Sequence, residues 1–219
     1  MLQQEFTSSS KLVKPLALNA VQGDYPIVET FLSIQGEGYW SGTSAYFIRL
    51  GGCDVGCPWC DQKETWYQKR HPVQSAQDLS QQAMQSRPAI VVITGGEPLL
   101  QDLELLTQLL KRKKLRIHLE TSGAYPLSGQ FDWITLSPKP FKPPQGDIYA
   151  QVNELKVIVS DIKDLSWAEE QAGKIPENAK KYLQPEWNSS QSQQLCMDYI
   201  LENPSWCLSL QTHKYLGVR

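Results

Sequence analysis

The sequence predicts an α/β protein whose parallel sheet or partial barrel lacks some of its helices. From Tyr25 onward, short apolar runs alternate with stretches of helical periodicity, and this alternation is typical of parallel βαβ units. Ten residues separate a predicted strand that ends at Glu120 from the next one, which begins at Phe131. A helical crossover takes a dozen residues or more, so at least one connection is expected to lack its helix.

Apolar runs and their flanking residues predict the first two strands and the helix after them. Residues 44–50 form the first predicted strand, which ends at Gly51-Gly52, and residues 88–94 form the second. The second run is almost entirely apolar and rich in β-branched residues, as expected for a strand buried on both faces. Pro98 suits the first turn of a helix, and the basic run 111–114 suits its C-terminus. A helical stripe of leucines lies between them: Leu99, Leu100, Leu103, Leu106, Leu109 and Leu110.

The rest of the chain continues the alternation of strands and helices. Strands are predicted over residues 115–120, 131–136, 155–160 and 180–183, helices over 166–173 and 189–201, and a last extended piece over 206–210. Residues 1–24 are polar and show no apolar period, so we expect them to form an extension. Residues 25–219 are expected to form a single domain.

Composition excludes several classes of protein. The 219 residues carry 21 Lys and Arg against 23 Asp and Glu, a net charge of −2, which argues against nucleic acid as a partner. Hydrophobic residues make up 41% of the chain, too many for a disordered protein. No apolar run approaches the ~18 residues that a membrane helix needs, and the interrupted apolar residues near the N-terminus make a poor signal peptide. We expect a cytoplasmic protein with no membrane partner.

Three of the five cysteines lie close together directly after the first predicted strand. Cys53, Cys57 and Cys60 have the spacing C-x3-C-x2-C, whereas Cys196 and Cys207 lie far downstream. An odd number of cysteines without an export signal argues against a disulfide framework, so the group is interpreted as a ligand set. Iron–sulfur clusters are normally held by four cysteines, and a local set of three leaves one iron free to bind something other than protein.

A zinc site is the alternative that the spacing leaves open. Structural zinc needs a fourth ligand, which His71, His118, Cys196 or Cys207 could supply. A chance grouping of cysteines without any metal is a second alternative.

Two motifs together resemble the radical S-adenosylmethionine (SAM) superfamily. The first is the cysteine motif with an aromatic residue, Trp59, before its last cysteine, and the second is Thr94-Gly-Gly-Glu-Pro98 at the end of the second strand. The resemblance implies a [4Fe-4S] cluster on Cys53, Cys57 and Cys60, with SAM chelating the fourth iron. It also implies a full or partial (β/α)6 barrel, here with a reduced set of helices.

Further motifs resemble one family within it, the 7-carboxy-7-deazaguanine synthases. The most specific are Ser33-Ile-Gln-Gly-Glu-Gly38 and the tail Gln211-Thr-His-Lys-Tyr-Leu-Gly217. The match also runs through Arg49, Trp59–Asp61, Glu120–Gly123, Ser137–Lys139 and Glu154–Lys156, and so covers residues 25–219. The implied reaction is a radical ring contraction of 6-carboxy-5,6,7,8-tetrahydropterin to 7-carboxy-7-deazaguanine with loss of ammonia, a step of queuosine and deazapurine biosynthesis. SAM is regenerated, so it serves as a cofactor.

The resemblance also implies residue roles and partners. The residues implied to bind SAM are Trp59, Gly96, Glu97, Ser122, Ser137, Pro138, Lys139 and Gln184. Those implied to bind the pterin are Ile34, Gln35, Gly36, Glu37, Arg49, Thr94 and Arg219. A flavodoxin or ferredoxin is the implied reductant, and a homodimer the implied assembly.

Several of these residues also have plain structural interpretations. Gln35 and Gly36 could form a tight turn, and Arg49 could belong to a structural ion pair. Lys139 and Glu154 could pair with each other, and His213 could brace the mouth of the barrel.

The chain departs from the family pattern at two positions. Where the family usually has a Thr or Ser that binds Mg²⁺, two residues after the last cysteine, this chain has Gln62. An amide oxygen is a competent Mg²⁺ ligand, so we keep Mg²⁺ as an expected cofactor with Gln62 as its ligand. In the segment that follows the strand 180–183, only Gln184-Pro185 matches the family closely.

Two other functions share part of this pattern. A radical SAM activating enzyme, which makes a glycyl radical on a partner protein, would also carry the cysteine loop and the Gly-Gly-Glu-Pro segment. It would have no need of a pterin pocket. A zinc-stabilised interaction domain is the non-enzymatic alternative.

Overall fold

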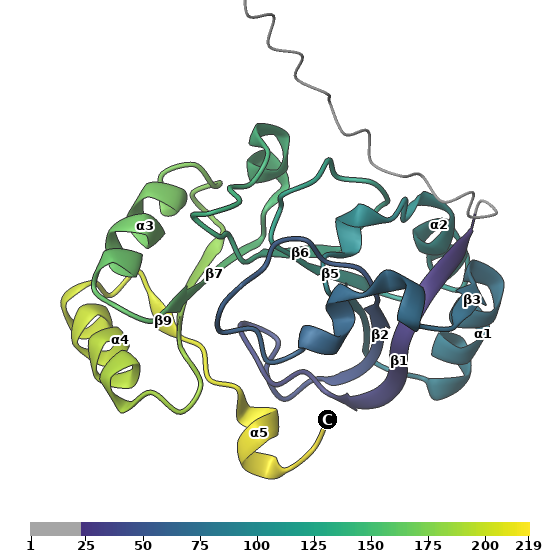
Figure 1. The fold of residues 1–219 in the computed structure, drawn as a ribbon, viewed down its shortest axis with the longest axis horizontal. Helices are drawn as coiled ribbons and strands as arrows, with labels where there is room; N and C mark the ends of the chain where they lie inside the picture. Colours follow the sequence, from purple (N-terminus) through teal and green to yellow (C-terminus); the bar gives the residue numbers. More distant parts are fainter. Residues whose placement is uncertain (1–22) are drawn as a thin grey trace, which may run out of the picture.

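The computed structural model describes residues 23–219, which form one curved nine-stranded sheet with helices on its outer side (Figure 1). The strand order is β3-β1-β2-β4-β5-β6-β7-β8-β9. The strands are β1 (Asp24–Ile34), β2 (Ser44–Leu50), β3 (Val73–Ser75), β4 (Ile90–Gly95), β5 (Ile117–Thr121), β6 (Trp133–Leu136), β7 (Glu154–Val159), β8 (Lys180–Pro185) and β9 (Cys207–Leu208). The predicted extension 1–24 lies outside the described residues except for its last two positions, and Asp24 is already part of β1.

Most of the sheet is parallel, as predicted. The pairs from β2–β4 to β8–β9 are all parallel, while β1 pairs antiparallel with both β2 and β3. The helices are α1 (Ala76–Ser86), α2 (Glu104–Arg112), α3 (Lys163–Ala172), α4 (Ser190–Glu202) and α5 (Thr212–Leu216), with short 3-10 turns η1 (Lys63–Trp66), η2 (Gln68–Arg70), η3 (Pro98–Leu100) and η4 (Gly146–Gln151). The sheet does not close on itself, which confirms a partial barrel.

The reduced helix complement is confirmed at the connection from β5 to β6. Residues 122–132 between these strands contain no helix, and the connection from β6 to β7 carries only η4. None of the helices within residues 23–219 has the length and apolar character that a membrane crossing requires.

The prediction of one long helix beginning at Pro98 is wrong. Pro98 starts only the short turn η3, and the chain is extended at Gln101 before α2 begins at Glu104. The carboxylate of Glu97 explains the turn, because its Oε1 accepts a hydrogen bond from the N–H of Leu99 over 3.0 Å. Asp102, two residues before α2, accepts from the N–H of Glu104 in the first turn of this helix over 3.0 Å.

Two strands and two helices were not predicted from the sequence: β1, β3, α1 and α5. β3 has only three residues, too few to show a period. β1 contains Pro26 and several polar residues, so it shows no clean alternation. α1 is rich in glutamine, and its buried face consists largely of small residues. α5 is a helix of five residues with none of them buried, so it has no apolar periodicity to detect.

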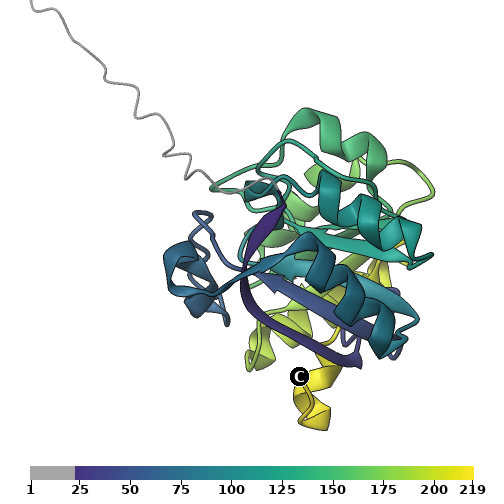
Figure 2. The ribbon, with the colours of Figure 1, turned by 90° about the vertical axis from the view of Figure 1, so that its right-hand side faces the viewer.

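The alternation of side chains along the strands divides the interior into two parts. Outward-facing residues such as Ile117 and Leu119 of β5 pack under the helices in the main core. Their neighbours His118 and Glu120 point to the inner side of the curved sheet. Figure 2 shows the segment that carries η1 and η2 standing away from the body of the sheet.

Candidate active site

One cavity of about 290 Å³ brings the predicted site residues together. It lies where the parallel strands end, and the cysteine loop and the C-terminal segment also line it. Within the described part of the chain, every predicted site residue lines this cavity except Pro138, which is buried nearby. Its volume is close to the lower end of the range for small-molecule sites.

The cysteine loop and the Gly-Gly-Glu-Pro segment are fixed to each other through their backbones. The N–H of Gly96 donates to Leu50 O over 3.0 Å, and the N–H of Glu97 donates to Gly52 O over 2.9 Å. The two segments are so close that a Cβ atom at Gly96 would lie 2.3 Å from Gly52 O and 2.7 Å from Cys53 Cβ. Only glycine permits this approach, so the two motifs form one wall of the cavity.

The donor set of this wall fits an iron–sulfur cluster. Cys53, Cys57 and Cys60 are free thiols that are partly exposed to the cavity. Burial raises the pKa of the Cys53 and Cys57 thiols, and the ammonium of Lys139 acts in the opposite direction on Cys57. Among residues 23–219, no three His, Cys, Asp or Glu side chains lie close enough to hold a single metal ion. Iron–sulfur clusters are held by cysteine thiolates, and this loop brings three of them to the cavity.

The four residues considered as a fourth zinc ligand all lie elsewhere. His71 Nε2 lies 2.9 Å from the backbone oxygen of Glu64, and His118 is buried against Trp40. Cys196 is buried in the main core, and Cys207 is exposed on β9. None of the four lines the cavity formed by the described residues, so the structure supplies no zinc site from this set.

Trp59 carries a further sign of a bound group. Its Nε1 is buried without a hydrogen-bond partner among the described residues. Its ring lies 5.9 Å from that of Phe141 in an edge-to-face arrangement. A buried unpaired donor beside a cavity calls for a ligand acceptor, and this fits SAM beside the cysteine loop.

Glu97 is buried and fully engaged by protein donors. Its Oε1 accepts from the N–H of Leu99 over 3.0 Å and from Thr121 Oγ1 over 2.6 Å. Its Oε2 accepts from the N–H of Ser122 over 2.8 Å and from the Ser122 hydroxyl. The carboxylate therefore ties the end of β5 to η3 and leaves its negative charge at the wall of the cavity.

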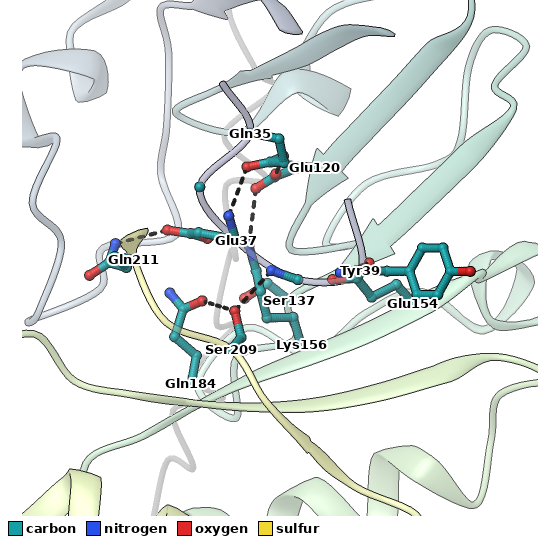
Figure 3. A network of polar contacts seen from close by, with 12 residues as sticks. Gln35, Glu37, Tyr39, Glu120, Ser137, Glu154, Lys156, Gln184, Ser209 and Gln211 are labelled. Carbon is teal, nitrogen blue, oxygen red and sulfur yellow. Dashed lines mark hydrogen bonds and ion pairs between the residues drawn. The ribbon is translucent and has the colours of Figure 1, made fainter. Parts of the chain in front are cut away.

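A buried group of charges forms a second wall of the same cavity (Figure 3). Lys156 Nζ donates to Glu37 Oε2, and it lies 3.2 Å from Glu120 Oε2. Glu120 Oε1 accepts from Gln35 Nε2 over 2.8 Å, and Glu37 Oε1 accepts from Gln211 Nε2 over 2.9 Å. These residues come from the end of β1, from β5, from β7 and from the C-terminal segment.

The electrostatics of this group keep Glu37 and Lys156 charged. Burial alone would raise the pKa of Glu37, but the charge and hydrogen bond of Lys156 overcome this and lower that pKa to about 2. Burial alone would lower the pKa of Lys156, but the carboxylates of Glu120, Glu37 and Glu154 hold it above its ordinary value. The carboxylates of Glu37 and Glu120 both line the cavity beside this one ammonium, so this wall favours a ligand rich in N–H donors.

Glu154 anchors the loop that follows Glu37. Its Oε2 accepts from the N–H of Tyr39 over 3.2 Å and from Trp133 Nε1 over 3.1 Å. Burial raises the pKa of Glu154 to about 7. The interpretation of Glu154 and Lys139 as a pair is wrong, because Lys139 Nζ instead donates to Ser137 O over 2.6 Å and Ser137 Oγ over 2.7 Å.

The structural ion pair considered for Arg49 is present. Arg49 Nε donates to Glu29 Oε1 over 2.9 Å, and Arg219 Nη1 lies 3.4 Å from Glu29 Oε2. Both guanidinium groups lie 5.9 Å from the centre of the Phe31 ring. Arg49 nevertheless lines the cavity, and its Nη atoms have no hydrogen-bond partner within residues 23–219.

The C-terminal segment crosses the open side of the sheet between β9 and the end of β1 (Figure 1). The N–H of Thr212 donates to Gly36 O over 2.9 Å, and a Cβ atom at Gly36 would lie 2.2 Å from His213 Nδ1. Burial lowers the pKa of His213. Gln184 of β8 also contacts the C-terminal segment. Its Oε1 accepts from Ser209 Oγ, and Ser209 Oγ in turn accepts from the N–H of Gly38.

The sequence analysis assigned no function to Glu120 or Lys156, although both belong to motifs that resemble the family. The signal that could have found them is alternation along the predicted strands, which places both side chains on the inner face. Gln62 lines the cavity as expected, and its side chain has no hydrogen-bond partner among the described residues.

Comparisons with known proteins agree with this geometry. The family model of the radical SAM superfamily matches residues 47–137. The 7-carboxy-7-deazaguanine synthase of Synechocystis sp. is 61% identical over 195 residues, 89% of this chain and 94% of that protein. The synthase of Flavobacterium psychrophilum is 48% identical, covering 94% of this chain and 99% of that protein.

A solved structure shows the same likeness in three dimensions. The crystal structure of QueE from Escherichia coli matches with a TM-score of 0.78 and 32% identity, over 87% of this chain and 95% of that one. Since relatives at this identity align along almost their whole length, the chain belongs to the 7-carboxy-7-deazaguanine synthase family of the radical SAM superfamily.

Proposed function

We propose that this protein converts 6-carboxy-5,6,7,8-tetrahydropterin into 7-carboxy-7-deazaguanine and ammonia, as a radical SAM carbon–nitrogen lyase. One observation carries the proposal: the three-cysteine loop and the buried Glu37–Lys156–Glu120 group line one and the same cavity. A cavity of this kind places a radical source and an acceptor-rich binding wall around one small molecule.

The cofactor half of the proposal rests on the cysteine loop. Cys53, Cys57 and Cys60 would hold a [4Fe-4S] cluster, whose reduced form with SAM supplies the radical that removes hydrogen from C6 of the pterin. We assign the SAM contacts to the residues of this wall: Trp59, Gly96, Glu97, Ser122, Ser137, Lys139 and Gln184. The charge of Glu97 attracts the amino group of SAM, and the unpaired Nε1 of Trp59 offers a donor to the adenine.

The substrate half rests on the second wall. The pyrimidine edge of a pterin presents several N–H donors, and the carboxylates of Glu37 and Glu120, which both contact the ammonium of Lys156, are acceptors for them. Gln35 and the backbone of residues 34–36 supply the remaining contacts to this edge of the pterin. Arg49, whose Nη atoms have no hydrogen-bond partner among residues 23–219, would pair with the carboxylate of the substrate, and Thr94 and Arg219 line the same cavity.

The chain's own residues orient and enclose the reacting molecule. Two fixed walls hold the pterin ring and SAM at a set distance, and this positioning removes much of the entropic cost of reaction. Gln211 and Thr212 join the C-terminal segment to Glu37 and Gly36, which limits access of water to the cavity. Shielding of this kind protects radical chemistry from side reactions.

The proposal includes a magnesium ion, a reductant and an assembly. We place Mg²⁺ on the side-chain oxygen of Gln62, which faces the cavity without a protein partner among residues 23–219. A flavodoxin or ferredoxin is the proposed electron donor, and a homodimer is the proposed assembly, both by family resemblance. The five free cysteines suit the reducing cytoplasm.

The test is an anaerobic assay of the reconstituted protein with SAM, dithionite and carboxytetrahydropterin. We expect 7-carboxy-7-deazaguanine and ammonia in equal amounts, with no net consumption of SAM. A protein that contains iron and sulfide and cleaves SAM but leaves the pterin unchanged would overturn the substrate assignment. It would favour an activating enzyme for a glycyl radical, which does not bind a pterin tightly.

A further inference from the structure

Two aspartates flank the cysteine loop, and each is held by a lysine from a distant segment. Asp54 follows Cys53, and its Oδ1 lies 2.5 Å from Lys142 Nζ. Asp61 follows Cys60, and its Oδ2 lies 2.5 Å from Lys214 Nζ. Lys142 belongs to the connection after β6, whereas Lys214 belongs to α5 in the C-terminal segment. The two ends of the cysteine loop are therefore anchored to different parts of the molecule.

Lys214 makes its contact with Asp61 in a partly shielded place. Only 20% of the Lys214 side chain is exposed, and its ammonium lies 4.7 Å from the centre of the Trp187 ring. Trp187 in turn packs edge-on against Tyr215, with ring centres 5.3 Å apart. A cation between a carboxylate and an aromatic face is held more strongly than a fully exposed ion pair.

Gln211 connects this contact to the second wall of the cavity. Its Nε2 donates to Glu37 Oε1 over 2.9 Å, and its Oε1 accepts from Lys214 Nζ over 2.9 Å. A continuous series of polar contacts thus leads from Glu37 through Gln211 and Lys214 to Asp61, the neighbour of Cys60.

The segment that carries these contacts has few others to hold it. Within residues 212–216 no side chain is buried, and Tyr215 and Leu216 are more than half exposed. A segment with so little buried apolar surface opens locally at low free energy. Its position therefore depends on the polar contacts of Gln211, Thr212 and Lys214 and, at the chain end, on the contacts of Arg219 with Glu29 and Ser33. A ligand that strengthens one of these contacts shifts the segment toward its seated state.

We propose that Lys214 is a positioning residue that couples the pterin wall of the cavity to the cysteine loop. The coupling rests on the proposed function, because it assigns the pterin to Glu37. Substrate that binds Glu37 fixes the position of Gln211, and with it the C-terminal segment. Because the fixed segment holds Lys214 against Asp61, the loop next to Cys60 becomes better ordered. Lys142 holds the other end of the loop whether substrate is present or not.

Hydrogen–deuterium exchange of the anaerobically reconstituted protein with SAM, with and without carboxytetrahydropterin, tests this coupling. In the unaltered protein we expect the pterin to slow exchange of residues 209–219 and, about fivefold, of the loop 53–62. In Lys214→Met we expect the pterin still to slow exchange in the C-terminal segment, because Thr212 still contacts Gly36. The slowing of exchange in the loop 53–62 disappears. In the matched variant Lys142→Met the loop exchanges faster throughout, but the pterin still slows it.

An equal pterin-dependent slowing of the loop in Lys214→Met and the unaltered protein would overturn the proposal. If the pterin slows exchange nowhere in the unaltered protein, the proposed substrate is wrong. The contact between Lys214 and Asp61 is then tested without pterin. In that comparison, with SAM alone, Lys214→Met must accelerate exchange near Asp61. Unchanged exchange there would overturn the role of Lys214 as well.

Discussion

Gly38 lies directly against the carboxylate of Glu154, so that a Cβ atom at position 38 would be 1.9 Å from Glu154 Oε1. The other carboxylate oxygen accepts from the N–H of Tyr39, the next residue in the chain. β7 thereby fixes the loop that carries Glu37 at a point one residue away from the buried charges of the cavity. The position of Glu37 depends on this close approach.

Replacement of Gly38 by alanine tests that dependence. Gly38 has φ +62°, a left-handed conformation that costs an alanine about 1–2 kcal/mol, and displacement of Glu154 adds about 1–3 kcal/mol. We expect a lower free energy of unfolding in urea and weaker pterin binding. Gly42→Ala is the matched control, because Gly42 has φ +86° but a Cβ atom at that position would have no described atom within 4 Å. Equal losses in the two variants would show that Glu154 does not restrict position 38.

Glu154→Gln separates the charge of Glu154 from its hydrogen bonds. Burial raises the pKa of Glu154 from 4.5 to about 7 in the folded protein, so the folded state binds a proton that the unfolded state releases in this window. The contribution of Glu154 to stability is therefore complete below pH 4.5 and is lost as pH rises to about 7, a change of about 3 kcal/mol. Glutamine keeps the acceptor oxygen for Tyr39 and Trp133 and does not titrate.

Urea unfolding from pH 4.5 to pH 8 measures this difference. We expect the free energy of unfolding of Glu154→Gln to rise relative to that of the unaltered protein as pH increases across this window. Parallel curves for the two proteins would mean that the carboxylate of Glu154 has an ordinary pKa.

The location of the site was predictable because its motifs follow predicted strands. Cys53 comes just after β2 and Glu97 just after β4, and the carboxyl ends of parallel strands meet at one edge of the sheet. The inner face of the sheet was harder to predict, since Glu120 and Lys156 stand in strands whose other residues are apolar. Their pairing depends on the curvature of the sheet, which no local pattern encodes.

The contacts of the C-terminal segment were also beyond what local sequence patterns can predict. Its motif was recognised, but the contacts of Gln211 and Lys214 join residues that are 174 and 153 positions apart in the chain. Short elements were missed for a related reason. α5 is stabilised by polar contacts with Gly36 and Asp61, and not by an apolar face that periodicity would reveal.

Lys156→Met removes the only ammonium that contacts Glu37 and Glu120 among the described residues. The two carboxylates then remain partly buried without a counter-charge, and we expect a loss of about 3 kcal/mol in the free energy of unfolding. Urea unfolding at pH 7 measures this loss. Lys174→Met is the control, because Lys174 forms an exposed pair with Glu170 in α3, and such pairs contribute under about 0.5 kcal/mol. Similar effects of the two substitutions would contradict a buried role for Lys156.

Cys57→Ser tests the ligand set of the cluster. A serine hydroxyl does not replace a thiolate on iron, so we expect iron and sulfide after anaerobic reconstitution to fall far below those of the unaltered protein. Cys207→Ser serves as the control, because Cys207 is exposed on β9 and lies outside the cavity. A Cys57→Ser protein with full iron and sulfide content would remove Cys57 from the ligand set.

Gln62 replaces the hydroxyl residue that the family usually carries, and its substitution tests the magnesium site. Gln62 lines the cavity, and the backbone oxygen of Gln62 already accepts from Thr65 Oγ1 over 2.7 Å. Only the side-chain oxygen of Gln62 is therefore available to a cation. Loss of a direct oxygen ligand weakens a metal site at least as much as loss of an outer partner, which costs about tenfold or more. We expect the Mg²⁺ concentration for half-maximal product formation to rise about tenfold in Gln62→Ala and to stay near the original value in Gln62→Thr. An unchanged Mg²⁺ response in Gln62→Ala would mean that substrate and water alone hold the ion, since the variant still contains every other residue of the cavity.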